Sequence, residues 1–177
     1  NSRVQVLSAA GVPVATRSLQ FWPDGVIPLG DGSFVATSFY YGQSCASRLQ
    51  PTSGGASLLT TWTVTSGLGL QQNYCAGIAV DTDGSLLTTS RWWLPSTSSD
   101  GYSLLRIDVA TGVVTAPFAG GASTCVLETT SWANERCVPR GVAVEPSGTI
   151  LVTDVGRNAV VRLARDGTVL ATWGVTP

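Results

Sequence analysis

Short runs of apolar and β-branched residues, separated by turn residues, recur along the whole chain. Three segments align with one another on their own residues: DGVIPLGDGSFVATSF from Asp24, AGIAVDTDGSLLTTSR from Ala76 and RGVAVEPSGTILVTDV from Arg140. In each, a glycine opens one apolar run, a polar turn follows, and a second run rich in Val, Ile and Thr comes after it. The second run ends in an equivalent threonine: Thr37, Thr89 and Thr153. This pattern predicts a β-hairpin in each segment, formed by strands that we name A and B.

A second kind of hairpin, with strands C and D, follows each of the first. Its copies are SRLQPTSGGASLLTTW from Ser47, LRIDVATGVVTAPF from Leu105 and VRLARDGTVLATW from Val161, and the opening RVQVLSAAGVPVAT is a fourth. A glycine in each copy supplies a turn position that needs positive φ, namely Gly11, Gly54, Gly112 and Gly167. The runs are too short, and too often broken by Gly and Pro, for helices.

The chain is therefore predicted to begin with a C–D hairpin and to continue through three A–B–C–D units. A four-stranded antiparallel unit cannot cover both its faces alone, and radial stacking of such units in a propeller buries them. We predict an all-β fold, a single segment of a β-propeller of four-stranded antiparallel blades, with an incomplete ring in this chain. The partial blade is expected at residues 1–21, and the three blades at 22–62, 75–118 and 139–174.

The repeated pattern G-[VI]-A-[VL]-[DE]-x-x-G-x-[IL]-x-[VT]-T-[DS], followed by N-x-x-V-x-[LV], resembles the NHL-type β-propeller repeat. The stretch from Pro139 to Gly174 matches closely, the unit from Ala76 well, and the unit from Asp24 loosely. The resemblance implies the fold. Because this family includes lyases, lactonase-like enzymes, RNA-binding modules and extracellular scaffolds, it implies no single activity.

About three and a half blades cannot close a ring of six, and an open propeller leaves exposed strand edges. Two partners are expected for these edges: other blades of a longer chain, or neighbouring copies that pair edge strand to edge strand. The segment of a longer chain is the favoured interpretation.

Charge and composition remove several classes of function. The net charge is −1, all ten basic residues are Arg, and the chain has no His. Scattered arginines in a near-neutral chain lack the footprint of nucleic-acid binding. No apolar window approaches the roughly 20 residues of a membrane helix, so no membrane span is expected. Histidine is the commonest general base and metal ligand, and no metal or cofactor is expected here.

The four cysteines, Cys45, Cys75, Cys125 and Cys137, form no C-x-x-C pair. Two disulfides are favoured over free thiols, which predicts an oxidising compartment and hence an extracellular or cell-surface location. The predicted pairs are Cys45–Cys75 across a blade junction and Cys125–Cys137 within one long D–A loop, because other pairings would bridge longer distances.

Strand alternation places all B–C and D–A connections at one end of the propeller, where the longest inserts lie. Six aromatic residues gather in these inserts: Tyr40, Tyr41, Tyr74, Trp92, Trp93 and Trp132. Clustered aromatics suit sugar stacking or the centre of a protein interface. The alternative is that they pack onto the blade ends and shield the core, and the sequence leaves both open.

Charged residues recur in two places. Asp81 and Asp83 in DTDG resemble the start of a calcium loop, but the downstream ligands are missing and a hairpin turn is favoured. Arginines recur at one strand position, namely Arg48, Arg106 and Arg162. They are interpreted as solvated residues that alternate with buried ones, with Asp108 and Asp166 as the nearby candidates for any ion pair.

The resemblance also bears on catalysis. Amidating-lyase members of the family hold a metal with histidine, which this chain lacks, and lactonase-like members hold a cation with converging carboxylates and Asn. Here Asp154 ends a B strand, but its equivalents are Ser38 and Ser90. No catalytic residue is therefore assigned.

The expected function is a non-catalytic extracellular structural or interaction module of a surface or fibre-forming protein. Its inserts PTSGGAS and LPSTSSDG suit O-linked sugars. The alternatives are a ligand- or carbohydrate-binding propeller of a larger secreted protein, with a glycan or protein as ligand, and a lactonase- or lyase-like propeller enzyme.

Overall fold

The structure is a computed structural model that describes residues 3–19, 22–38, 46–52, 55–62, 71–94, 99–115 and 138–174. A two-stranded hairpin comprises β1 (Arg3–Leu7) and β2 (Pro13–Ser18). The first blade comprises β3 (Pro23–Pro28), β4 (Phe34–Ser38), β5 (Ala46–Thr52) and β6 (Gly55–Trp62). The second comprises β7 (Gln71–Val80), β8 (Leu86–Leu94), β9 (Ser99–Ile107) and β10 (Val114–Thr115). The third comprises β11 (Pro139–Val144), β12 (Ile150–Asp154), β13 (Ala159–Leu163) and β14 (Val169–Gly174).

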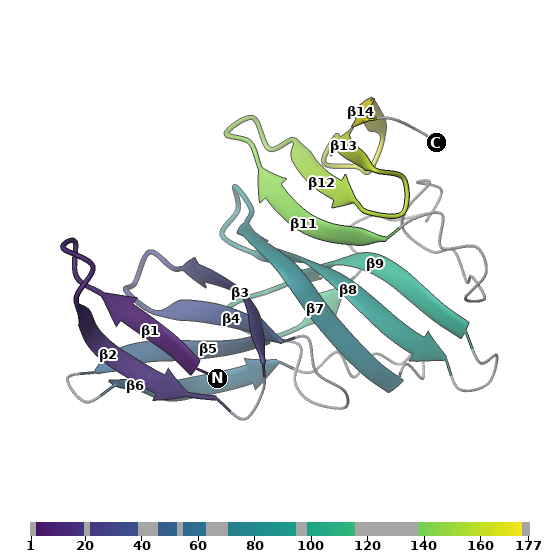
Figure 1. The fold of residues 1–177 in the computed structure, drawn as a ribbon. Coiled ribbons are helices and arrows are strands. Elements are labelled where there is room, and N and C mark those ends of the chain that lie inside the picture. Colours follow the sequence, from purple (N-terminus) through teal and green to yellow (C-terminus); the bar gives the residue numbers. More distant parts are fainter. Residues whose placement is uncertain are drawn as a thin grey trace.

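In every blade, each strand pairs antiparallel with the next strand along the chain. Figure 1 shows the hairpin β1–β2 against the first blade and the three blades following one another along an open arc. The prediction of an all-β fold built from four-stranded antiparallel propeller blades is confirmed. Among the described residues, none belongs to a helix long and apolar enough to cross a membrane.

The A–B turns show why the chain reverses where it does. In the second blade the N–H of Gly84 donates to the carbonyl of Asp81 at 2.9 Å, and in the third Gly148 donates to Glu145 at 2.8 Å. Gly84 has a φ of +85° and Gly148 a φ of +83°, a backbone region that residues with a Cβ rarely adopt. The glycine of each turn therefore allows the chain to reverse between the two strands that it joins.

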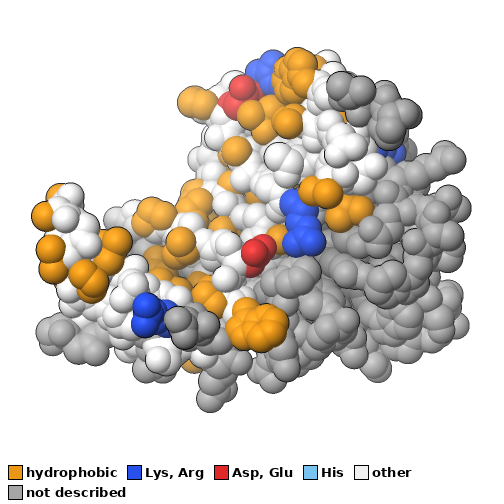
Figure 2. Space-filling view, in the orientation of Figure 1, with side chains coloured by type: hydrophobic (Ala, Val, Ile, Leu, Met, Phe, Trp, Pro, Cys, Tyr) orange, Lys and Arg blue, Asp and Glu red, His pale blue; other side chains and the backbone are white. Residues whose placement is uncertain are grey.

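The apolar core lies between neighbouring blades. In β8, Leu86 packs in a cluster with Val35 of the first blade, whereas Leu87 packs with Ile150 and Val152 of the third. Successive residues of a strand point to opposite faces of the sheet, so one strand supplies two cores. Both leucines are fully buried. Figure 2 shows hydrophobic side chains still exposed over the third blade, at the top of the view.

Candidate functional site

An acidic residue in each A–B turn pairs with an arginine on the C strand of the same blade. The pairs are Asp31–Arg48, Asp83–Arg106 at 2.8 Å and Glu145–Arg162 at 2.6 Å. The interpretation of these arginines as solvated strand residues is wrong, and so are Asp108 and Asp166 as their partners. The arginine side chain is long enough to carry its guanidinium from the C strand to the A–B turn of the same blade.

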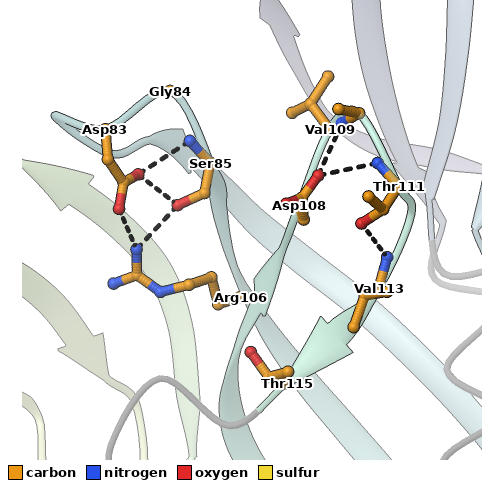
Figure 3. A pocket seen from close by; sticks show the side chains of 10 residues that line it. Asp83, Gly84, Ser85, Arg106, Asp108, Val109, Thr111, Val113 and Thr115 are labelled. Atoms are coloured by element: carbon orange, nitrogen blue, oxygen red, sulfur yellow. Dashed lines mark hydrogen bonds and ion pairs between the residues drawn. The ribbon is translucent and has the colours of Figure 1, made fainter.

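In the second blade this pair is part of a tight polar group at the A–B turn. Asp83 accepts hydrogen bonds from the N–H of Ser85 at 2.9 Å and from its hydroxyl at 2.6 Å. Arg106 donates to Asp83 and to the Ser85 hydroxyl oxygen, at 2.8 Å each. The carboxylate, the hydroxyl and the guanidinium therefore fix one another in place (Figure 3).

Asp81 and Arg165 extend this group across the boundary with the third blade. Asp81 is 3% exposed, and its carboxylate lies 2.8 Å from Arg106 and 3.2 Å from Arg165. Arg165, from the turn between β13 and β14, also lies 2.9 Å from Asp83. Two carboxylates and two guanidiniums balance in charge, which a buried carboxylate requires. DTDG forms the A–B hairpin turn, and the described residues contain no group of three or more His, Cys, Asp or Glu placed to hold a metal.

A cavity of about 730 Å³ opens beside this group, between the A–B and C–D turns of the second blade (Figure 3). Its lining residues are Asp83, Gly84, Ser85, Arg106, Asp108, Val109, Ala110, Thr111, Val113 and Thr115.

Two carboxylates of this cavity stay ionised at neutral pH. The pKa of Asp83 is lowered by the hydroxyl and N–H of Ser85 and then by the nearby arginines. The pKa of Asp108 is lowered by the N–H and hydroxyl of Thr111 and then by the N–H of Ala110, while the charge of Asp83 opposes the shift. A general acid or base works best with a pKa near the operating pH, so these two groups are suited to accept hydrogen bonds.

Most of the binding and disulfide residues predicted from the sequence lie outside the described residues: Tyr40, Tyr41, Cys45, Cys125, Trp132 and Cys137. Tyr74 lies in β7, and Trp92 and Trp93 lie in β8, so their backbone is strand where loop inserts were expected. Cys75 is fully buried and disulfide-bonded. Its predicted partner, Cys45, lies outside the described residues, so the pairing stays a prediction.

Sequence reasoning identified Asp83, Arg106 and Asp108 one by one but did not bring them together in a cavity. The available signal was the recurrence of an acidic A–B turn and an arginine in the same blade. Nothing in the sequence pattern marked the space between the two turns.

The model of the NHL repeat matches residues 137–163, which include β11, β12 and β13. This part of the chain is an NHL repeat. The resemblance drawn from the sequence is thereby confirmed. Among curated proteins, no sequence matches the chain.

Solved structures are similar in fold to nearly the whole length of the chain. Virginiamycin B lyase from Staphylococcus aureus matches with a TM-score of 0.63 at 14% identity, over 99% of this chain and 50% of the lyase. A catalytically inactive variant of that lyase, with alanine in place of a histidine and with quinupristin, matches with a TM-score of 0.63 at 13% identity, over 99% and 50%. A "putative gluconolactonase" matches with a TM-score of 0.61 at 21% identity, over 98% and 56%. The chain thus spans about half the length of these structures and shares their fold.

These comparisons correct the function expected from the sequence. A non-catalytic extracellular structural module is the wrong expectation, because solved structures that match 98–99% of the chain bear the names of a lyase and a gluconolactonase. The expectation rested on the disulfide pattern, the loop aromatics, the Ser/Thr-rich inserts and the open edges, none of which reports on the rest of the ring.

Proposed function

We propose that the chain is a sector of a propeller enzyme of the lyase or lactonase kind, and that the cavity of the second blade binds a small polar molecule. The cavity carries the proposal. Its volume of about 730 Å³ falls in the range of roughly 300–1,000 Å³ that is usual for small-molecule sites. Its charged groups are held by fixed hydrogen bonds, so a ligand meets a preorganised surface.

The lining favours a ligand that donates hydrogen bonds. Asp83 and Asp108 offer ionised carboxylates on opposite sides of the cavity (Figure 3), and Ser85 lies beside the first of them. Val109 and Val113 add apolar surface on the C–D turn. A compact molecule with several hydroxyl groups, or with an ammonium group, and an apolar ring face fits this combination.

The likeness in fold supports the class of reaction in this proposal. The lyase is inactive when alanine replaces one of its histidines, and the present chain contains no histidine. A reaction on this chain would therefore use other groups, and the described sector contributes ligand binding in this proposal.

Calorimetric titration of the chain with glucono-1,5-lactone and with quinupristin tests the proposal. We expect saturable binding of at least one probe, weakened about tenfold by Asp108→Asn, because one charge-assisted hydrogen bond is worth roughly 1.4 kcal/mol or more. Asp31→Asn is the matched control, since Asp31 pairs with Arg48 in the first blade but does not line the cavity. Absence of binding by both probes, or equal effects of the two variants, would contradict the proposal.

An oxidising, extracellular compartment is proposed for the protein as well. The support is the disulfide at Cys75, since disulfides persist chiefly outside the reducing cytosol. Alkylation of free thiols in protein taken directly from its source should leave Cys75 unlabelled until a reductant is added.

A further inference from the structure

A threonine hydroxyl joins each blade to the next at the two blade boundaries that the structure describes. Thr89 on β8 donates to the carbonyl of Arg140 on β11 at 2.6 Å and accepts from the N–H of Gly77 on β7 at 3.0 Å. Thr37 on β4 donates to the carbonyl of Ala76 on β7 at 2.7 Å. The hydroxyl therefore links the first strand of its own blade to the first strand of the following blade.

A glycine beside this threonine lets the two first strands approach. A Cβ at Gly77 would collide with the carbonyl of Arg140 and would lie 2.8 Å from the Cα of Gly141. A Cβ at Gly25 would lie 2.8 Å from the carbonyl of Ala76. The backbone of the following blade thus explains why each of these positions is glycine.

The third blade has the same threonine and glycine, but no following blade among the described residues. Thr153 accepts from the N–H of Gly141 at 2.7 Å, as its equivalents do. In the described part of the chain, the three heavy atoms nearest to a Cβ at Gly141 all belong to the side chain of Thr153, at 3.0 Å and beyond. Thr153 is exposed, whereas Thr37 and Thr89 are 0% and 1% exposed.

Apolar residues surround Thr153 on this face of the sheet. Strand register places Thr153 opposite Val160, and Val160 opposite Trp173, so the three share one face. Leu151 is on the same face, two residues from Thr153. Trp173 is 51% exposed. The opposite face of this sheet, which includes Val161, packs against the second blade.

We propose that this outer face of the third blade, defined by Leu151, Thr153, Val160 and Trp173, docks a further four-stranded blade of the same repeat. The hydroxyl of Thr153 donates to the carbonyl that precedes the glycine in the first strand of that blade. The apolar residues of the outer face form the next inter-blade core, in continuity with the two interfaces already present. This inference does not depend on the proposed small-molecule function.

A second copy of the described sheets does not fit this face. The carbonyls of Ala76 and Arg140 already accept from threonines within the chain. The remaining first strand is β3, in the first blade. The face of this blade that points away from the second blade is covered by β1–β2, where Val4 and Val6 pack against Phe34. A third blade from another copy would need the space that this hairpin fills. The occupant is therefore a blade from polypeptide outside the described residues.

Hydroxyl-radical footprinting tests the proposal on protein isolated from its source, compared with the recombinant 177-residue chain. We expect Trp173 to be oxidised several-fold more slowly in the source protein than in the recombinant chain. Trp22, 61% exposed on the first blade, is the control and should react equally in both. Equal oxidation of Trp173 in the two preparations would overturn the proposal.

Alanine substitution of two glycines gives a second readout. In the recombinant chain, Gly77→Ala should lower the unfolding midpoint and Gly141→Ala should change it little. In the source protein both should lower it. An unchanged midpoint for Gly141→Ala in the source protein would overturn the proposal. A second result would also overturn it: a dimer of 177-residue chains in which Trp173 is protected and which Thr153→Val dissociates. A second copy would then be the occupant.

Discussion

The hydroxyl of Thr89 lies 2.6 Å from the carbonyl oxygen of Arg140, although the two residues are 51 positions apart in the chain. In this contact a side chain donates to a backbone carbonyl, so the contact depends on the identity of Thr89 and not on that of Arg140. It joins β8 to β11, and it is buried on the side of β8. The boundary between the second and third blades is therefore specified by a polar contact as well as by apolar packing.

Replacement of Thr89 by valine should lower the free energy of unfolding by roughly 1–3 kcal/mol, because it removes the hydrogen bonds that the hydroxyl makes with the N–H of Gly77 and the carbonyl of Arg140. Thr89→Ser keeps the hydroxyl and should recover most of the loss. Urea unfolding followed by tryptophan fluorescence measures both. Thr153→Val in the same chain is the matched control, and a loss as large as that of Thr89→Val would show that the contact to Arg140 contributes little.

The two arginines that contact Asp81 should differ in their effects on stability. Arg106, with 20% of its side chain exposed, contacts buried Asp81, and Arg106→Leu should cost about 2–4 kcal/mol by leaving that carboxylate poorly compensated. Arg165 is 46% exposed, and Arg165→Leu should cost about 1 kcal/mol or less. A double-mutant cycle in urea measures the coupling. Equal losses for the two variants would contradict this ranking.

Stability should fall in acid because turn carboxylates have lowered pKa values. The pKa of Asp31 is lowered from 3.8 to about 2, first by the hydroxyl and N–H of Ser33 and then by Arg48. Below pH 3.8 the unfolded chain binds a proton at Asp31 that the folded chain does not bind until about pH 2, so this contribution is present above pH 3.8 and is lost as the pH falls through that window.

Urea midpoints measured between pH 5 and pH 2 should therefore decline, and Asp31→Asn should make the decline shallower. Ser33→Ala removes the main donor, and carboxyl NMR should then report a higher pKa for Asp31. If the urea midpoint of Asp31→Asn declined with pH as steeply as that of the unchanged chain, this origin of the acid sensitivity would be contradicted.

Reduction of the Cys75 disulfide should destabilise the chain by about 2–4 kcal/mol, measured as a lower urea midpoint in a thiol reductant. The partner of Cys75 can be assigned by a tryptic map without reduction. Arginine positions place Cys45 in peptide 18–48 and Cys75 in peptide 49–91, and the predicted pairing joins these two. Linkage of Cys75 to a peptide with Cys125 or Cys137 would refute it.

The sequence was sufficient for the fold because the repeat supplies the same local signals several times. Gly84 and Gly148 mark turns that close at equivalent carbonyls, and the β-branched runs between turns became strands. The inter-blade role of Thr89 was not predicted, although its recurrence was visible. A hydroxyl that reaches another blade depends on how two sheets stack, and strand periodicity within one sheet does not contain that information.

The candidate site was predicted less well for two physical reasons. Long side chains such as Arg106 find partners along the sheet as well as across it, so strand position alone did not identify Asp83. The cavity depends on how the A–B and C–D turns of one blade lie in space, and strand periodicity does not contain that information. Tyr74 lies within the longer strand β7 because pairing with β8 continues past the expected strand end.

The junction made by Thr89 and Gly77 has a consequence for how such a protein can change its size. Each unit brings its own hydroxyl donor on one side and its own acceptor carbonyl on the other, so duplication of a unit creates a matching junction without any further substitution. Loss of a unit restores a working junction in the same way. The number of units in this architecture can therefore vary by gene duplication or by engineering, while the sequence rule at every junction stays the same.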